Sequence, residues 1–147
     1  MKASTPDVTI VTCTVCVGTW PETDRWIADV GITKAYLFDD QFFPGWTVLV
    51  LNRHATELFD LTREERGRLI EDLSAVATAL ALAFEPVKLN YELLGNQTPH
   101  IHWHVIPRLA DDPALREPVW RVAHDPLRLT ASQRQDRIAR IQTQLTI

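Results

Sequence analysis

The sequence predicts an α+β protein in which an antiparallel sheet is covered by one long helix and a shorter C-terminal helix. Three observations carry this expectation. Two strand-like segments flank a Pro-Gly turn, a helical apolar repeat follows a capping signal, and a later segment alternates histidines with apolar residues. A chain of 147 residues has the size of one domain, so we expect a single domain over residues 1–147.

The first part of the chain predicts a hairpin. Residues Val8 to Val17 are β-branched and indicate extended chain. The segment from Pro21 to Gly31 starts with proline, carries early acidic residues and ends with glycine, which favours a short helix. Lys34–Asp40 and Trp46–Asn52 predict two strands, joined through the turn at Pro44 and Gly45.

A long helix is predicted next. Thr62 is a typical N-cap, and Glu65 three residues later completes a capping box. Pro86 marks the expected end of the helix. Apolar side chains recur at helical spacing between these limits: Leu69, Leu73, Val76, Leu80 and Phe84.

The remaining elements are two strands and a second helix. Val87–Leu94 and His100–Pro107 have the composition of strands, with a loop from Gly95 to Pro99 between them. Ile138, Ile141 and Leu145 indicate a helix from about Thr130 to Leu145.

Composition excludes several classes of function. The net charge of −4 gives no general attraction to nucleic acid or to an anionic membrane. No run of about 18 apolar residues spans a membrane, and the N-terminus has no apolar core of a signal peptide. We therefore expect a cytoplasmic protein, in which Cys13 and Cys16 do not form a structural disulfide.

Three histidines alternate with apolar residues in the predicted strand from His100. His100, His102 and His104 would share one face, and Ile101 and Trp103 the face toward the helix. The outer two would lie about 13 Å apart, so one metal ion does not easily collect all three. Two of them with a distant ligand could still hold zinc, and a solvated strand face is the third interpretation.

A catalytic row explains the pattern best. A neutral imidazole is a competent nucleophile toward phosphorus when its other ring nitrogen is held by an acceptor, and neighbouring imidazoles can donate to phosphate oxygens. Asn96, Gln97 and Thr98 precede the row in a loop that could face a phosphate.

The segment His100-Ile101-His102-Trp103-His104-Val105-Ile106 resembles the signature of the histidine triad (HIT) family, in which three histidines alternate with apolar residues. The resemblance extends over about Ala35 to Trp120, through the hairpin, the long helix and the strand that precedes the triad. Within the family the chain is similar to bacterial members of the diadenosine-polyphosphate hydrolase type.

The resemblance implies a five-stranded antiparallel sheet, a homodimer, and nucleotidyl transfer or hydrolysis at an α-phosphate without a catalytic metal. It implies that His102 attacks the phosphorus and forms a covalent nucleotidyl-histidine. The backbone carbonyl of His100 would orient His102, and His104 would hydrogen-bond the phosphate. The His100 side chain would act on the leaving-group side.

The resemblance also implies residues that bind the nucleotide. Asp39 matches a position that holds ribose hydroxyls, with Asp40 as the second choice, and Asn90, Asn96 and Gln97 match polar positions that contact phosphates. The sequence gives expectations for three further residues. Arg108 is expected on the surface or near a phosphate, His124 in a surface loop, and Trp120 near the partner subunit's site.

Cys13 and Cys16 form a C-x-x-C pair, which is a weak signal by itself. Some family members hold a structural zinc ion with such a pair, a histidine after the hairpin and the first triad histidine. His54 and His100 stand at those places, and two thiolates with two imidazoles are a sound tetrahedral set. Two thiols without metal remain the alternative.

Three functions are consistent with these residues. The favoured one is a nucleotide hydrolase or transferase that acts on a dinucleoside polyphosphate or an AMP conjugate. A non-catalytic nucleotide-binding module and a hydrolytic metalloenzyme are the alternatives. The sequence does not identify the leaving group, because phosphoramidates, dinucleoside polyphosphates and nucleotide sugars present the same α-phosphate.

Overall fold

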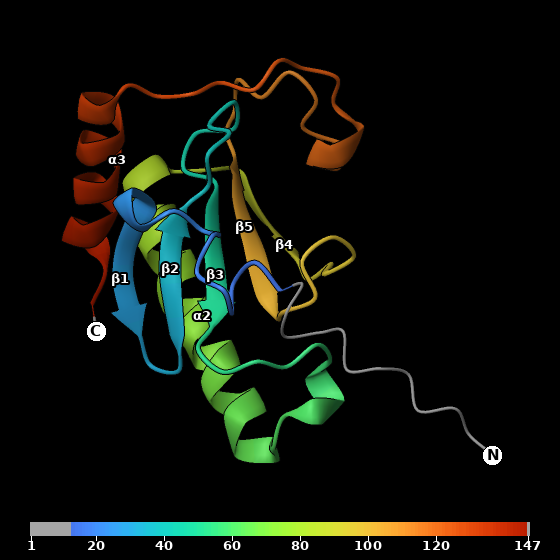
Figure 1. Cartoon of the computed structure of the whole chain (residues 1–147). Coiled ribbons are helices and arrows are strands. Elements are labelled where there is room, and N and C mark those ends of the chain that lie inside the picture. Colours follow the sequence, from blue (N-terminus) through green and yellow to red (C-terminus); the bar gives the residue numbers. More distant parts are fainter. Residues whose placement is uncertain (1–12, 147) are drawn as a thin grey trace.

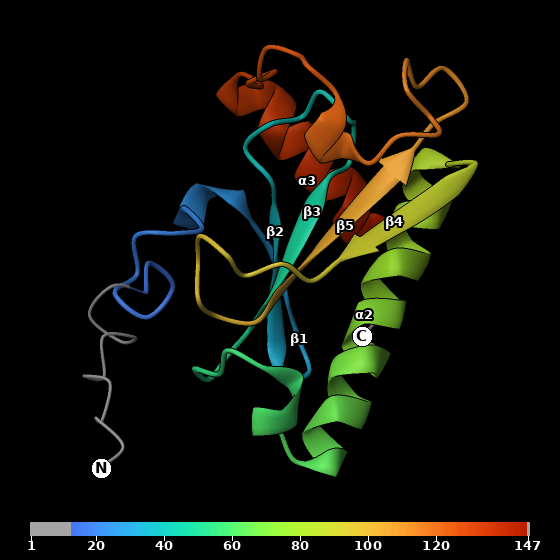
Figure 2. The ribbon, with the colours of Figure 1, turned by 90° about the vertical axis from the view of Figure 1, so that its right-hand side faces the viewer.

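A computed structural model describes residues 13–146 of the chain. They form a five-stranded antiparallel sheet of order β1-β2-β3-β5-β4, with α2 and α3 packed together against one face (Figures 1 and 2). The elements are β1 (Trp26–Val30), β2 (Thr33–Leu37), β3 (Thr47–Leu51), α2 (Arg63–Phe84), β4 (Lys88–Glu92), β5 (His102–Arg108) and α3 (Ala131–Gln144). The predicted α+β class and sheet are confirmed.

The hairpin of β2 and β3 is confirmed at the predicted place. β3 is buried along its whole length, which agrees with its continuous apolar sequence, and it occupies the centre of the sheet. Its two neighbours in the sheet are β2, which is joined to it by the turn, and β5, which lies far along the sequence.

Helix α2 begins as the capping box predicts. The Thr62 hydroxyl accepts a hydrogen bond from the Glu65 backbone N–H, and the Glu65 carboxylate accepts one from the Thr62 N–H. One stripe of the helix is buried against the sheet, including Leu69, Leu73, Val76 and Leu80. This packing fixes the face of β5 that carries Trp103 and Val105, because both side chains pack in the core on the helix side.

The predicted helix from Pro21 to Gly31 is wrong. One short 3-10 turn, Thr23–Arg25, is followed directly by strand β1. Ile27 and Val30 are buried in the core, and α3 covers this edge of the sheet. Burial against a distant helix therefore overrides the local helix signals.

The strand predicted from His100 begins two residues later, at His102. The N–H of Ile101 donates to the carbonyl of Ala55, in the loop after β3, so this residue lies outside the regular ladder. His102 and His104 pair with Val50 and Val48 on β3. His100 thus precedes the strand and is free to take a different orientation.

The C-terminal part of the chain returns across the β2–β3 turn (Figure 1). Between β5 and α3 the only regular element is the 3-10 turn Val119–Arg121. We call residues Val119–Thr130 the strap. Both backbone groups of Leu127 bind the β2–β3 turn. The Leu127 carbonyl accepts a hydrogen bond from the Gln41 N–H, and the Leu127 N–H donates to the Asp40 carboxylate. The predicted C-terminal helix is confirmed as α3, with Thr130 as its N-cap.

Two expectations concern the ends of the chain and membranes. The extended segment expected over Val8–Val17 lies partly outside the described residues, and Cys13–Val17 form turns instead. No helix in residues 13–146 combines the length and apolar character needed to cross a membrane.

Candidate active site

A cavity of about 460 Å³ lies over the triad face of β5. We call residues 13–20 the Cys loop. Four parts of the chain surround the cavity: the Cys loop, the β2–β3 turn, the loop before β5, and the strap. The residues that line it include Thr14, Trp20, Phe38, Asp39, Asn96, Gln97, Thr98, His102, His104 and Trp120. The second and third triad histidines therefore open into one cavity.

His102 is held in one tautomer by its own chain. Its Nδ1 lies 2.7 Å from the carbonyl oxygen of His100, and a carbonyl only accepts, so Nδ1 carries the proton. Nε2 then keeps its lone pair. Burial lowers the pKa of His102 despite the opposing effect of the His100 carbonyl, so the ring is uncharged at neutral pH.

His104 is held in the opposite tautomer, by a donor instead of an acceptor. The indole Nε1 of Trp46 lies 3.0 Å from His104 Nδ1, and an indole N–H only donates, so Nδ1 is the acceptor. The proton of the neutral ring is therefore on Nε2. Burial, and the neighbouring His102, lower the pKa of His104 to about 3, so this ring stays neutral across the physiological range.

His100 is directed away from the cavity. Its Nε2 lies 2.6 Å from the carbonyl oxygen of Leu51, and its Nδ1 lies 3.6 Å from the Sγ atoms of both Cys13 and Cys16. Both ring nitrogens of His100 therefore face partners outside the cavity, the Leu51 carbonyl and the two thiols. The expected action of the His100 side chain on the leaving group does not fit this geometry, because only its carbonyl reaches His102.

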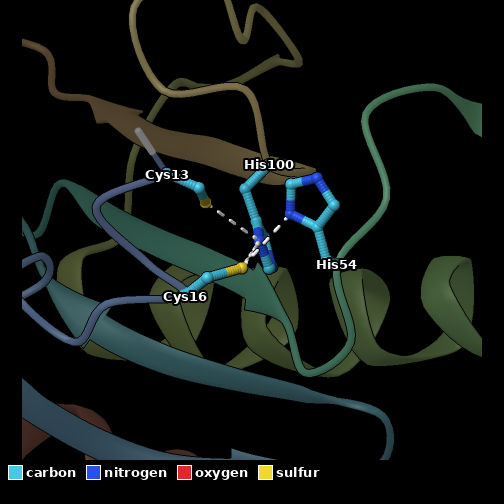
Figure 3. A group of neighbouring side chains, drawn as sticks. All are labelled: Cys13, Cys16, His54 and His100. Atoms are coloured by element: carbon cyan, nitrogen blue, oxygen red, sulfur yellow. Dashed lines mark hydrogen bonds between the residues drawn. The ribbon is translucent and has the colours of Figure 1, made fainter. Parts of the chain in front are cut away.

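Cys13, Cys16, His54 and His100 gather as the resemblance implied (Figure 3). One donor atom from each lies within 4.8 Å of the others. The His54 Nδ1 is 3.2 Å from Cys16 Sγ. We call these four residues the Cys/His cluster.

The expected nucleotide-binding residues are only partly brought together. Asp39, Asn96 and Gln97 line the cavity with His102 and His104. Asn90 does not: it pairs with Ile106, beyond His104 on β5, and its Oδ1 accepts a hydrogen bond of 2.8 Å from the Arg108 guanidinium. Asn90 lies instead beside a separate cavity that Arg108 and Glu117 also line.

The structure separates Asp39 from Asp40. Asp39 lines the cavity and pairs with the exposed Arg128 at 3.1 Å. The Asp40 carboxylate accepts from the Phe42 and Leu127 N–H groups and lies 2.7 Å from His124 Nε2. Asp40 therefore joins the turn to the strap, and His124 is its partner rather than a free surface residue.

Arg108 is a buried structural residue, contrary to the surface position expected. It is 1% exposed, pairs with Asp112 at 2.6 Å and donates to the carbonyls of Ala114 and Glu117. It thereby shapes the loop that leads to the strap.

Sequence reasoning missed most of the aromatic surroundings of the site. The Trp20 ring lies 5.1 Å from His102, and the Trp120 ring lies 5.2 Å from His104 of its own chain. Trp46 follows the Pro-Gly turn, but its partner His104 comes 58 residues later. The position of Trp46 next to that turn was the only local signal that it lies near the site.

Comparison with known proteins agrees with this geometry. A histidine triad protein from Bradyrhizobium japonicum superposes with a TM-score of 0.75 at 33% identity, over 82% of this chain and 90% of that one. One from Sinorhizobium meliloti has a TM-score of 0.75 at 30% identity, over 82% and 88%. A Zn-bound histidine triad family protein from Mycobacterium smegmatis has a TM-score of 0.67 at 19% identity, over 92% and 94%.

No match is found among curated proteins. The family model for the HIT domain matches residues 29–111, which include both strands of the hairpin, α2, β4 and the whole triad. Together with the relatives at 30% identity or more, this match establishes that the chain belongs to the histidine triad family.

Proposed function

We propose that this protein is a nucleotide hydrolase or transferase that acts at the α-phosphate of a dinucleoside polyphosphate or an AMP conjugate. The observation that carries the proposal is the state of His102. Its Nδ1–H is held by the His100 carbonyl at 2.7 Å, which leaves the Nε2 lone pair at the cavity. An uncharged imidazole oriented in this way is an activated nucleophile.

The proposed reaction has two displacements. His102 Nε2 attacks the α-phosphorus, a P–N bond forms, and the bond to the leaving group breaks with its electron pair on that group. Water then attacks the phosphorus, the P–N bond breaks, and its electron pair returns to Nε2. The water loses a proton, and the leaving group gains one from solvent.

His104 supports both steps as a donor. Its Nε2–H points to the cavity side because Nδ1 is occupied by Trp46, so it can hydrogen-bond a non-bridging phosphate oxygen as charge develops there. Asn96, Gln97 and Thr98 add polar groups to the same end of the cavity. No catalytic metal is required by these roles.

The walls of the cavity fit a nucleotide. Trp20, Phe38 and Trp120 give aromatic surfaces on which a base can pack, and Asp39 offers a carboxylate to ribose hydroxyls. The substrate class rests on this combination of apolar walls with polar phosphate and ribose contacts.

The test is to trap the intermediate. Purified protein is mixed with dinucleoside polyphosphates, a nucleotide sugar and a nucleoside phosphoramidate, and quenched samples are examined by mass spectrometry. We expect one added nucleotidyl group on the wild type and none on His102→Asn. Unaltered turnover in that variant would falsify the mechanism.

Two other outcomes identify the alternative functions. Nucleotides that raise the melting temperature while no substrate turns over would favour a non-catalytic binding module. Turnover that chelation abolishes while the fold remains intact would favour a metalloenzyme.

We also propose that the Cys/His cluster holds a structural zinc ion. Zn–S bonds of about 2.3 Å and Zn–N bonds of about 2.0–2.1 Å place tetrahedral S and N ligands ~3.6 Å apart. The three S···N separations, 3.6, 3.2 and 3.6 Å, agree with that edge. The Leu51 carbonyl at His100 Nε2 is a typical outer partner of a ligating histidine. The mycobacterial relative of the same fold is described as Zn-bound.

Bound zinc would supply structural cross-linking here, not chemistry. It would tie the Cys loop, the loop after β3 and the start of β5 together. Metal analysis tests the proposal: about one equivalent of zinc is expected, and freely reactive thiols without zinc would contradict it.

We propose, finally, that two chains form a homodimer through the β4 side of the sheet. β1 is covered by α3, whereas β4 is an edge strand with Val87 and Tyr91 exposed nearby, and Leu82 exposed on α2. An unpaired edge with apolar neighbours favours pairing with another chain. Sedimentation of the wild type against Tyr91→Lys tests this, and a monomeric wild type would contradict it.

A further inference from the structure

The hydrogen bond between Trp46 and His104 joins two buried side chains of different elements. Trp46 is 2% exposed and His104 is 5% exposed, and their Nε1 and Nδ1 atoms lie 3.0 Å apart. Among the described residues this is the contact that occupies His104 Nδ1. Because indole carries no acceptor nitrogen, the indole N–H is the donor and Nδ1 the acceptor wherever the His104 ring is neutral.

The indole is held firmly in place. The Trp46 carbonyl accepts from the Phe38 N–H and from the Gln41 side-chain amide, both at 2.9 Å. The Phe38 ring lies 4.4 Å from the indole on one side, and the Trp120 ring lies 5.2 Å away on another. The turn itself depends on Gly45, whose φ of +89 admits few other residues.

A neutral imidazole has two tautomers, and only one is useful at this position. With the proton on Nε2, His104 donates into the cavity. With the proton on Nδ1, it would turn a lone pair toward the phosphate oxygens and two N–H groups would face each other at Trp46. Burial keeps the ring uncharged, so protonation cannot supply the missing donor.

We propose that Trp46 is a positioning residue that selects the Nε2–H tautomer of His104 and thereby makes this ring a donor to the transferred phosphoryl group. The catalytic half of this statement rests on the function proposed above. The claim that Trp46 selects the tautomer of His104 does not depend on that function, and the two claims are measured separately.

The test compares three variants with the wild type. Trp46→Phe keeps an aromatic ring and removes the N–H. Trp46→His brings back an N–H donor on a smaller ring. Trp103→Phe is the matched control, because Trp103 Nε1 is buried on the opposite face of the same strand without a partner among the described residues.

The first readout is the protonation of the His104 ring nitrogens, measured by NMR on protein with isotope-labelled histidine. We expect Nε2–H alone in the wild type and in Trp103→Phe, a mixture of tautomers in Trp46→Phe, and recovery in Trp46→His. A single Nε2–H tautomer in folded Trp46→Phe, or an Nδ1–H tautomer in the wild type, would overturn the proposal.

The second readout is kinetic. For the substrate that turns over, kcat of Trp46→Phe should fall roughly tenfold, with a smaller change in KM, since a donor to developing charge acts mainly in the transition state. Trp46→His should recover part of kcat. A loss of melting temperature in Trp46→Phe with unaltered tautomer and kcat would mean a structural role alone and would reject the proposal. If no substrate turns over in any form, the proposed function fails while the NMR result still decides the role of Trp46.

Discussion

The two ends of the histidine row hold the same side chain in different chemical states. At the cluster end, His100 gives Nε2 to the Leu51 carbonyl and turns its Nδ1 to two thiols. At the cavity end, His102 gives Nδ1 to a carbonyl and keeps the Nε2 lone pair, while His104 accepts from an indole and keeps an Nε2–H. The role of each imidazole therefore follows from the partner of its other nitrogen.

This difference divides the row into two parts. The cluster end brings distant segments together, and the cavity end directs one lone pair and one N–H to the cavity. The two ends share one atom group, the His100 backbone, whose carbonyl orients His102.

The largest effect is expected at the nucleophile. His102→Asn should lower kcat by about 10⁴-fold or more, because the lone pair that attacks phosphorus is removed. Its zinc content and its melting temperature should stay close to those of the wild type. Steady-state kinetics, metal analysis and calorimetry check these values, and residual activity above a tenth of wild type would refute the assignment.

The opposite pattern is expected at the cluster. Cys16→Ser should reduce bound zinc from about one equivalent to near zero and lower the melting temperature by roughly 10 °C, since a bound metal stabilises the folded state. The activity of this variant should be lost near its lowered melting temperature. It should be kept at low temperature, because His102 is unchanged. A Cys16→Ser protein with full zinc content and unaltered stability would show that the cluster does not hold the metal.

The pH dependence of turnover separates the two cavity histidines. Burial lowers the pKa of His102 below the ordinary value of 6.5, so the nucleophile loses its lone pair only as the pH falls below that value. The kcat/KM is therefore expected to be level near neutral pH and to fall on acidification, with a midpoint below 6.5. A fall that starts above 6.5 would contradict an uncharged, buried nucleophile.

The smallest effect is expected at the strap. Burial opposes the charge on both partners, but hydrogen bonds outweigh it, so the pKa of Asp40 is lowered and that of His124 is raised. The pair contributes stability above the unfolded pKa of aspartate, near 3.9, and this contribution is lost as the pH rises through the raised pKa of His124.

Asp40→Asn should therefore lower the free energy of unfolding by about 1 kcal/mol near pH 6 and by less at pH 8. Glu117→Gln is the control, because its ion pair with Arg121 is exposed and 3.5 Å long. Denaturant unfolding at the two pH values measures both variants, and an equal loss at pH 6 and pH 8 would exclude His124 as the partner.

Local signals predicted the parts of the fold that depend on local interactions. The capping box at Thr62 and the period of α2 gave that helix to within a residue, and alternation gave the shared face of His102 and His104. The C-terminal helix followed from only three apolar residues. β1 was missed because its burial depends on α3, more than a hundred residues later.

The site was predictable where a motif carries it and not where tertiary contacts do. The triad and the four cluster residues were anticipated by resemblance, and Asp39, Asn96 and Gln97 reach the cavity. Asn90 does not line this cavity, and its Oδ1 accepts a hydrogen bond from Arg108, a contact between side chains 18 positions apart. The partner that fixes the His102 tautomer is two positions away in the sequence, and the partner of His104 is 58 positions away. Neither contact follows from the helix or strand periodicity of the sequence.

The strap has a consequence for the order in which the protein is made. Asp40 meets His124 across 84 positions, and Gln41 meets Arg137 across 96. Synthesis proceeds from the N-terminus, so the residues of the sheet, α2 and the triad leave the ribosome before the strap, which includes Trp120. The triad face of β5 therefore leaves the ribosome before Trp120, the residue that completes its aromatic wall.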